Sequence, residues 1–467
     1  MSQAIPQVRK GAVLAIIMAS YLMIVIDVSI VITGLPKIRA SLGFSAAGLS
    51  WVQNAYTLAF GSLLMLGAKA GDLWGRRRLL MAGLGLFTLA SLGIGLAQSP
   101  SGLLVARALQ GVGSAVLAPS TLALISIHFP EGPQRTRALS LYAAAAGIGA
   151  TLGLVLGGLF ADLFSWRAGF FINVPVGVAL MLATQRYVPE TAVRTGRLDV
   201  PGAVSSTFGM TALVYGLVHA AEQGWGDPLT VGALAAAGGL LTGFVLWQQR
   251  AAEPILPMRL FGNRARNAAY GARMLFLGGM VGFWFFSTQV LQGVLGMKAW
   301  VAGLAFLPTT VPNFLSAMAV PRLARKFGHA RVLAAGLLMG VAGLAWLGQV
   351  ATDSTYLANV ALPMVLIGLG QGCVLAPLTL FGVAGVDKAD AGAASGLVNV
   401  AHQVGGALGL AVLVVVFAHA GGTGAAPAVL AHRVAVVMDA SAFMVLLALV
   451  AVCARIVPVE VLNRKRI

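Results

Sequence analysis

The sequence predicts an all-α polytopic membrane protein built from two six-helix bundles and two inserted helices, fourteen transmembrane helices in all. Of its 467 residues, 58% are hydrophobic and only 10% are charged, whereas a soluble domain carries about 25% charged residues. Apolar runs of membrane-spanning length recur along the chain, and motifs of the first half return in the second. These three observations together indicate that most of the chain lies in lipid.

The predicted spans follow from apolar runs, because about 20 apolar residues cross a bilayer as one helix. They cover 11–35, 48–70, 79–98, 102–128, 138–161, 168–187, 201–220, 229–248, 268–292, 300–320, 331–350, 357–384, 392–419 and 435–456. The first span has no A-x-A cleavage site, so we expect it to be retained rather than removed as a signal peptide. An even number of spans places both chain ends on one side.

Basic residues predict which side that is, since Lys and Arg collect in cytoplasmic loops. With the amino terminus inside, most Lys and Arg fall in inner loops. The outer loops keep only Lys37, Arg39, Arg167, Lys298 and Arg433. The net charge of +17 therefore reflects topology, and no soluble basic domain points to nucleic acid. We expect a protein of the plasma (cytoplasmic) membrane with both termini in the cytoplasm.

Internal repeats predict a parallel duplication. GRRRLLMAGL at 75–84 resembles GHARVLAAGL at 328–337, VLAPSTL at 116–122 resembles VLAPLTL at 374–380, and IGATLGLV at 148–155 resembles VGGALGLA at 404–411. The offsets are 253, 258 and 256 residues. We expect a six-helix bundle at 1–190, a linker with two extra spans at 191–264, and a second bundle at 265–467. Parallel halves around a midplane site are one transporter layout.

Asp27 is the one charged residue between Gly11 and Pro36 in the first span. A charge at the bilayer centre costs about 2.5–3.5 kcal/mol on insertion scales, and such residues usually face a partner or a cavity. Two hypotheses follow. The carboxyl is a buried, hydrogen-bonded or permanently protonated group that locks helix packing, or it exchanges a proton in step with transport.

The segment GAKAGDLWGRRRLL at 67–80 reads as a tight inner loop. Gly71 and Gly75 allow a close turn. Its G-D-x-x-G-R-R-R spacing resembles the hallmark loop of the major facilitator superfamily. The resemblance implies a charge network of Asp72 and Arg76, with Arg77 beside them, that holds the two halves together in the outward-open state. The second copy, PRLARKFGHAR, has Arg325 where Asp72 stands, which predicts a weaker network there.

Arg107 lies in the apolar fourth span, and a buried guanidinium must find an acceptor. RALQGVGSAVLAP at 107–119 resembles the superfamily's arginine motif, which implies a part for Arg107 in proton transfer. An arginine that snorkels from the helix end is the alternative. We expect a charge relation with the first span, directly or through water.

Glycines of the fifth span repeat every four residues and are predicted to pack closely against another helix. They are Gly149, Gly153 and Gly157, with Gly158 following. Together with LFADLFSWRAGFFINVPVG they resemble the antiporter motif of drug exporters, which implies a seal or hinge between the halves. Leu154 stands where that family has proline, so we expect a softer or absent kink.

IDVSIVITGLPKI at 26–38 resembles the first-helix motif of the fourteen-helix drug:proton antiporter branch, with Ile32 in place of an asparagine. WRAGFFINVPVG at 166–177 is also typical of that branch. The resemblance is strong over residues 10–190 and weaker over 265–456, where His402 replaces a common arginine. The alternative branch of proton-coupled peptide importers has an E-x-x-E-R pattern that the first span lacks.

The resemblance implies multidrug efflux by alternating access, in which proton entry drives the exit of an amphiphilic substrate, a source of antibiotic resistance. An exporter of an endogenous metabolite, lipid or amino acid, or a facilitator without proton coupling, stays open. An enzyme is not expected, because no catalytic pairing recurs on neighbouring spans. We expect no cofactor and no metal, with the proton gradient as the energy source. The expected partners are the lipid bilayer, a small-molecule substrate and protons, for a monomeric protein.

The absence of acidic residues deep in spans nine to thirteen favours neutral, zwitterionic or monocationic amphiphiles over dications, by charge matching. Aromatic and polar residues inside the spans are candidates for the walls of the substrate cavity, with ordinary packing as the alternative for each aromatic. These residues are Tyr21, Asn54, Tyr56, Tyr142, Arg273, Trp284, Gln289, Asn399 and His402.

Overall fold

Helices make up the fold of the computed structural model, which describes residues 10–464 apart from 130–132, 192, 194, 195, 387–390 and 422–425. The predicted cytoplasmic tails at 1–9 and 465–467 lie outside the described residues. The helices longer than eight residues are α1 (Lys10–Leu42), α2 (Trp51–Trp74), α3 (Arg76–Leu96), α4 (Pro100–His128), α5 (Pro133–Leu163), α7 (Asn173–Tyr187), α8 (Val200–Gln223), α9 (Pro228–Arg250), α10 (Arg264–Gln289), α12 (Leu307–Phe327), α13 (His329–Leu347), α14 (Leu362–Val383), α15 (Ala391–His419) and α16 (Pro427–Arg455). The shorter ones are α6 (Ala168–Phe171), α11 (Ala299–Leu304) and α17 (Val457–Arg464).

Two predicted spans are broken where a proline removes a backbone donor. The sixth span divides at Ile172 into α6 and α7, because Pro175 cannot donate to the carbonyl of Phe171. The tenth span divides at 305–306 into α11 and α12, and Pro308 stands in the first turn of α12, where its fixed φ suits a helix start. Each pair of helices nevertheless forms one candidate span, Ala168–Tyr187 and Ala299–Phe327, in agreement with the predicted spans.

Twelve segments of the described residues are long and apolar enough to cross a membrane. α2 and α5 are long helices that are not among them. α2 carries Gln53, Asn54, Lys69 and Asp72, which lower its hydropathy, and the shorter apolar part of α5 covers Ile148–Leu163. The structure thus supports an all-helical membrane protein with twelve candidate spans, while the count of fourteen stays a prediction.

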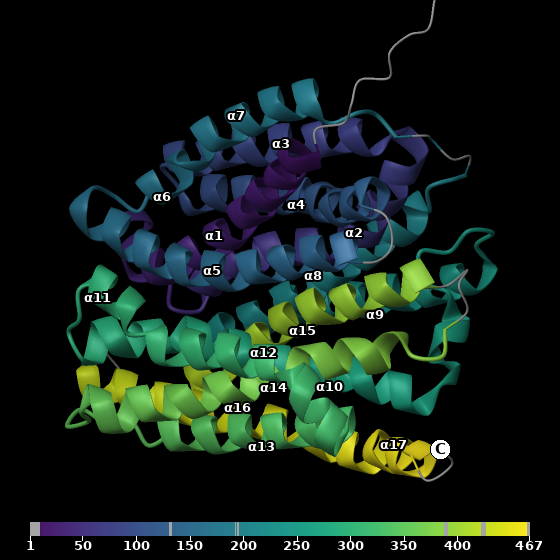
Figure 1. Cartoon of the computed structure of the whole chain (residues 1–467). Coiled ribbons are helices and arrows are strands. Elements are labelled where there is room, and N and C mark those ends of the chain that lie inside the picture. Colours follow the sequence, from purple (N-terminus) through teal and green to yellow (C-terminus); the bar gives the residue numbers. More distant parts are fainter. Residues whose placement is uncertain are drawn as a thin grey trace, which may run out of the picture.

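The helix pairings of the first part of the chain return in the last part. α1 packs on α5, α2 and α3 pack on α4, and α3 packs on α7. In the same way α10 packs on α15, α12 and α13 pack on α14, and α13 packs on α16. Figure 1 shows the first group, purple to blue, in the upper part of the molecule and the second, green to yellow, in the lower part. The exact boundaries of the halves stay a prediction.

The two inserted helices form a hairpin beside this arrangement. α8 packs on α9 along its length and also contacts α2 and α15, one helix from each group (Figure 1). Asp199 caps α8 by accepting from the Gly202 amide at 3.0 Å, and its carboxylate also accepts from Trp247 and Gln248 of α9, each at 2.6 Å. One carboxylate therefore joins the start of α8 to the end of α9.

Candidate functional site

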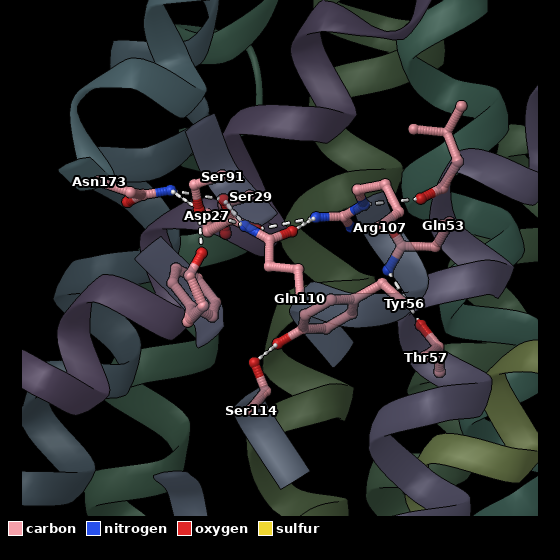
Figure 2. Close-up of polar contacts among 12 residues, drawn as sticks. Asp27, Ser29, Gln53, Tyr56, Thr57, Ser91, Arg107, Gln110, Ser114 and Asn173 are labelled. Carbon is pink, nitrogen blue, oxygen red and sulfur yellow. Dashed lines mark hydrogen bonds and ion pairs between the residues drawn. The ribbon is translucent and has the colours of Figure 1, made fainter. Parts of the chain in front are cut away.

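A fully buried ion pair lies between α1 and α4. Asp27 and Arg107 have no exposed surface, and Arg107 Nη1 donates to Asp27 Oδ2 at 2.9 Å. The other carboxylate oxygen, Oδ1, accepts from Gln110 Nε2 at 2.8 Å and from Asn173 Nδ2 at 2.7 Å. Figure 2 shows the α4 and α7 side chains converging on Asp27 of α1. Both oxygens of the carboxylate are thus satisfied inside the apolar bundle.

Arg107 is held in place by groups other than its counter-ion (Figure 2). Its Nε donates to the Val52 carbonyl at 3.0 Å and its Nη1 to Gln110 Oε1 at 2.6 Å. The guanidinium lies 4.5 Å from the ring centroid of Tyr56 and 5.9 Å from that of Phe170, within reach of a cation–π attraction. Arg107 therefore points into the bundle and does not snorkel, and the expected relation with the first span is direct.

Sequence reasoning missed the two amides of this site and the hydroxyl between them. Gln110 Nε2 also contacts Ser91 Oγ of α3 at 2.8 Å, and Asn173 Nδ2 does so at 3.3 Å. Gln110 lies three residues after Arg107, which places both on one helix face. Asn173 begins α7 at the break before Pro175. The three-residue spacing of Arg107 and Gln110 and the proline after Asn173 are therefore the sequence signals that could have identified these two amides.

Protonation of Asp27 would disturb this arrangement. Breaking a buried ion pair by removing one charge costs about 3–5 kcal/mol, because the other charge is left unpaired in a medium of low dielectric. A proton on Asp27 would remove one of the two charges and leave Arg107 without a counter-ion. Proton uptake at this carboxyl therefore favours a rearrangement that gives Arg107 water or another acceptor.

The loop between α2 and α3 carries a second ion pair, of Asp72 with Arg76. The Arg76 amide donates to Thr191 Oγ1 at 2.9 Å, and a Cβ at Gly71 would lie 2.6 Å from Arg76 Nη1. The partners of Asp72 and Arg76 among the described residues lie before residue 192. A function of this network between the two halves stays a prediction.

The start of α3 is bound by a carboxylate from beyond α7. Gly75 has φ 97°, a left-handed conformation that favours glycine. The Arg77 and Arg78 amides donate to the Glu190 carboxylate at 3.0 and 3.2 Å. Arg77 Nη2 also donates to the Gln185 carbonyl at 2.9 Å. The predicted loop residues thus fasten α3 to the end of α7.

The glycines of α5 bring its backbone against α1. A Cβ at Gly153 would lie 2.7 Å from the Ile26 carbonyl oxygen, and one at Gly157 would lie 2.6 Å from that of Ile30. Gly149 faces the same helix one turn earlier. Because such contacts leave no room for a side chain, these glycines fix α5 beside the segment of α1 that carries Asp27.

A neighbouring face of α5 meets the last group of helices. A Cβ at Gly158 would lie 2.3 Å from the Ala299 carbonyl oxygen, and a Cβ at Gly303 of α11 would lie 2.5 Å from that of Leu154. α5 runs as one helix through Leu154. The glycine set therefore lies between α1 and α11, while its role as a hinge stays a prediction.

The predicted wall residues of the first half fall into two places. Tyr21 and Tyr142 stack with ring centroids 3.8 Å apart, and the Tyr142 hydroxyl lies 3.1 Å from Thr121 Oγ1 of α4. Tyr56 instead belongs to the ion-pair site, where its hydroxyl donates to Ser114 Oγ at 2.9 Å. The structure therefore places Tyr21 and Tyr142 in contact and places Tyr56 apart from them.

The wall residues of the second half are also divided. Arg273 of α10 contacts His402 of α15, with Nη2 3.2 Å from Nδ1. Trp284 packs against Phe306, with ring centroids 4.9 Å apart. Asn399 is exposed and donates to a carbonyl of its own helix. Arg273 and His402 are therefore the pair that the structure unites.

Two predicted wall residues carry buried polar atoms without partners among the described residues. Asn54 is fully buried, and neither its oxygen nor its nitrogen has a hydrogen-bond partner there. Gln289 is 9% exposed, and its Nε2 also has none there. Buried amides of this kind are costly unless water or a ligand completes their bonds.

A profile of the Major Facilitator Superfamily matches residues 17–410. The chain belongs to the major facilitator superfamily. It is 42% identical over 421 residues to the cephamycin export protein of Amycolatopsis lactamdurans, which covers 89% of this chain and 86% of that protein. It is 39% identical over 414 residues to the puromycin resistance protein of Streptomyces alboniger, with 87% and 82% covered.

Solved structures of the superfamily share the fold at low sequence identity. The crystal structure of a nucleoside transporter matches with a TM-score of 0.68 at 13% identity, covering 95% of this chain and all (100%) of that chain. A peptide transporter matches with a TM-score of 0.70 at 15% identity, covering 95% and 94%. These matches establish a major facilitator fold for this integral membrane protein, and the antibiotic-export relatives agree with the multidrug-efflux type predicted from its motifs.

Proposed function

We propose that this protein exports amphiphilic small molecules, antibiotics among them, by proton-coupled alternating access. Two relatives above are named for cephamycin export and puromycin resistance, each matched over more than 80% of both chains. A lincomycin resistance protein of Streptomyces lincolnensis is 35% identical over 395 residues. Export is supported by these relatives, and proton coupling by the chemistry of the buried site.

The observation that carries the coupling is the fully buried contact of Asp27 with Arg107. In the proposed cycle, Asp27 takes a proton from the outside, the ion pair with Arg107 opens, and the cavity closes and reopens toward the cytoplasm. Proton release inside restores the pair. Because substrate and proton favour opposite states, proton entry drives substrate exit.

The finer architecture belongs to the same proposal. α2 and α5 would complete fourteen spans, with halves at 1–190 and 265–467 and a two-helix linker at 191–264. Both termini would lie in the cytoplasm of a monomer that uses the proton gradient and no cofactor. The Asp72–Arg76 network would hold the two halves together in the outward-open state. The glycines of α5 would form a seal or hinge between the halves.

Export by the Asp27→Asn variant in proteoliposomes tests the coupling. The amide keeps the size and one acceptor of the carboxylate but cannot exchange the proton. We expect the pH gradient to drive uptake of a puromycin-type amphiphile into inside-out vesicles that contain the wild type. Gradient-driven uptake by the variant should be at least about tenfold slower. Asp439→Asn, on α16 of the other half, is the matched control and should keep the wild-type rate.

Gradient-driven transport that persists in Asp27→Asn would refute the proposed coupling. Downhill transport without any response to the gradient in the wild type would instead indicate a facilitator. Transport of none of the antibiotics, with gradient-driven movement of a cellular metabolite, lipid or amino acid, would favour export of an endogenous compound.

A further inference from the structure

The second half of the molecule buries a cation that pairs with no carboxylate among the described residues. Arg273 of α10 is 6% exposed. Its Nη1 donates to Thr379 Oγ1 of α14 at 3.0 Å and lies 3.5 Å from the Leu375 carbonyl oxygen. Its Nη2 lies 3.2 Å from His402 Nδ1 of α15. A guanidinium offers no acceptor, so Nδ1 accepts and the ring proton of a neutral His402 resides on Nε2.

The sequence excludes a compensating acid on the three helices that carry this cluster. α10, α14 and α15 contain no Asp or Glu between their first and last residues. Among the described residues, no ion pair includes Arg273. Arg107 differs in this respect, because Asp27 neutralises it. A buried charge without a partner is unfavourable, and a mobile anion would relieve it.

Donors around Arg273 are also left without acceptors. Arg273 Nε is buried and has no hydrogen-bond partner among the described residues. The Nε2–H of His402 has none there either, since the contacts of this ring are made through Nδ1. Thr379 is exposed, so the cluster reaches the protein surface along α14. A positive charge with spare donors at an accessible edge is suited to an anion.

The internal repeat relates this cluster to an uncharged cluster at the equivalent place in the first half. Thr379 in VLAPLTL matches Thr121 in VLAPSTL. Thr121 contacts Tyr142, which stacks on Tyr21 of α1. The equivalent positions of the two halves therefore hold an aromatic pair and a cation. α1 and α10, which carry Tyr21 and Arg273, contact each other, so both clusters belong to helices that meet between the halves.

We propose that Arg273, with His402 and Thr379, forms a subsite that binds the carboxylate of the exported amphiphile. The inference rests on the proposed export function and adds that amphiphiles with one carboxylate, alone or within a zwitterion, bind through this subsite. The guanidinium supplies the charge, and His402 and Thr379 position it. Neutral amphiphiles are transported without this contact.

Binding of a matched pair of probes tests the subsite. Dansyl-phenylalanine and its methyl ester share one apolar body and differ by the carboxylate. We measure the dansyl fluorescence of each on protein in phosphatidylcholine nanodiscs. The wild type should bind the acid about tenfold or more tightly than Arg273→Gln does, since a charge-assisted bond is lost. The ester should bind both proteins equally, and Arg273→Lys should restore part of the preference for the acid.

Arg322→Gln is the control for general electrostatics, because it removes an exposed charge from the same half and should leave both affinities unchanged. His402→Ala should weaken binding of the acid but not binding of the ester. A preference for the acid that survives in Arg273→Gln, or no saturable binding of the acid to the wild type, would overturn the subsite. Competition by phosphatidylglycerol in the nanodisc would overturn it too, since the cluster would then bind a lipid headgroup.

Two further measurements separate misfolding and failure of the export proposal from failure of the subsite. Arg273→Gln removes an unpaired buried charge, so its thermal midpoint should equal or exceed that of the wild type, and a lower midpoint would argue against an unpaired cation. Gradient-driven transport of the ester by the wild type tests export alone. Ester transport without any acid preference overturns the subsite and leaves the export proposal intact.

Discussion

At the scale of single residues, the buried carboxylate depends on donors from two other helices and on a serine of a third that accepts from two of those donors. Arg107 and Gln110 of α4, Asn173 of α7 and Ser91 of α3 form one connected network around Asp27. A network in a medium of low dielectric is stabilising only while its members are satisfied. Local changes of charge at Asp27 therefore act on several helices together.

A double-mutant cycle of Asp27→Asn and Arg107→Gln measures the strength of this pair. Each single variant leaves one buried charge unpaired and should lower the free energy of unfolding by about 3–5 kcal/mol. The double variant replaces both charges by amides and should recover a large part of that loss. Thermal or denaturant unfolding in detergent provides the four values, and additive losses would show that the two charges do not interact.

Sequence reasoning reached the charges of this site but not its amides. Asp27 and Arg107 are conspicuous because charges are rare in apolar spans. Gln110 and Asn173 are polar residues without a charge, and their use depends on how α4 and α7 are rotated against α1. A single sequence contains the helix periodicity, but the relative rotation of distant helices is set by tertiary packing.

At the scale of helices, two tight turns are closed in the same way. Gly75 and Gly328 have φ 97° and 96° at the starts of α3 and α13. Glu190 accepts from the amides at the start of α3, and Glu460 accepts from the His329 and Ala330 amides at 2.9 and 2.7 Å. Carboxylates are favourable at helix amino termini. The second loop, predicted to have a weaker charge network, thus keeps the carboxylate cap.

Substitution of either cap should destabilise its own half. Glu190→Gln and Glu460→Gln each weaken two charge-assisted bonds to backbone amides, which predicts a loss of about 1–3 kcal/mol of unfolding free energy. Glu253→Gln, at an exposed carboxylate that pairs with Lys69, is the control and should leave the thermal midpoint unchanged. Equal midpoints for all three variants would refute the structural role of the caps.

The helix starts illustrate the limit of prediction at this scale. The repeat of glycine and basic residues at 75–84 and 328–337 predicted two equivalent loops. The capping acids lie further along the chain, since Glu190 comes 113 residues after Arg77 and Glu460 comes 131 residues after His329. They belong to segments outside the matched repeats, so the sequence offered no pattern linking them to the loops they close.

At the scale of the whole molecule, the two halves have similar helix pairings and different chemistry. The first half holds the neutralised pair of Asp27 and Arg107, and the second holds the buried Arg273, which has no acidic partner among the described residues. α5 contacts both α1 and α11, and α8 contacts both α2 and α15. Movement of one half against the other would therefore change the contact of Gly158 with Ala299, on the helix whose other glycines lie against α1.

The contacts of α5 connect the segment around Asp27 with the second half of the molecule. Gly153 and Gly157 pack closely against the Ile26 and Ile30 carbonyls, on either side of Asp27, and Gly158 packs closely against α11. Packed cores of this kind switch between discrete arrangements more readily than they deform. In the proposed cycle, a change of the ion pair in α1 would be transmitted by α5 to the other half.

The central claim is that Asp27 exchanges a proton as substrate binds. The most direct measurement is proton release from purified protein in weakly buffered detergent on addition of a transported amphiphile, followed with a pH-indicator dye. The account predicts release by the wild type that is abolished in Asp27→Asn and kept in Asp439→Asn. Equal proton release from the wild type and Asp27→Asn would contradict it.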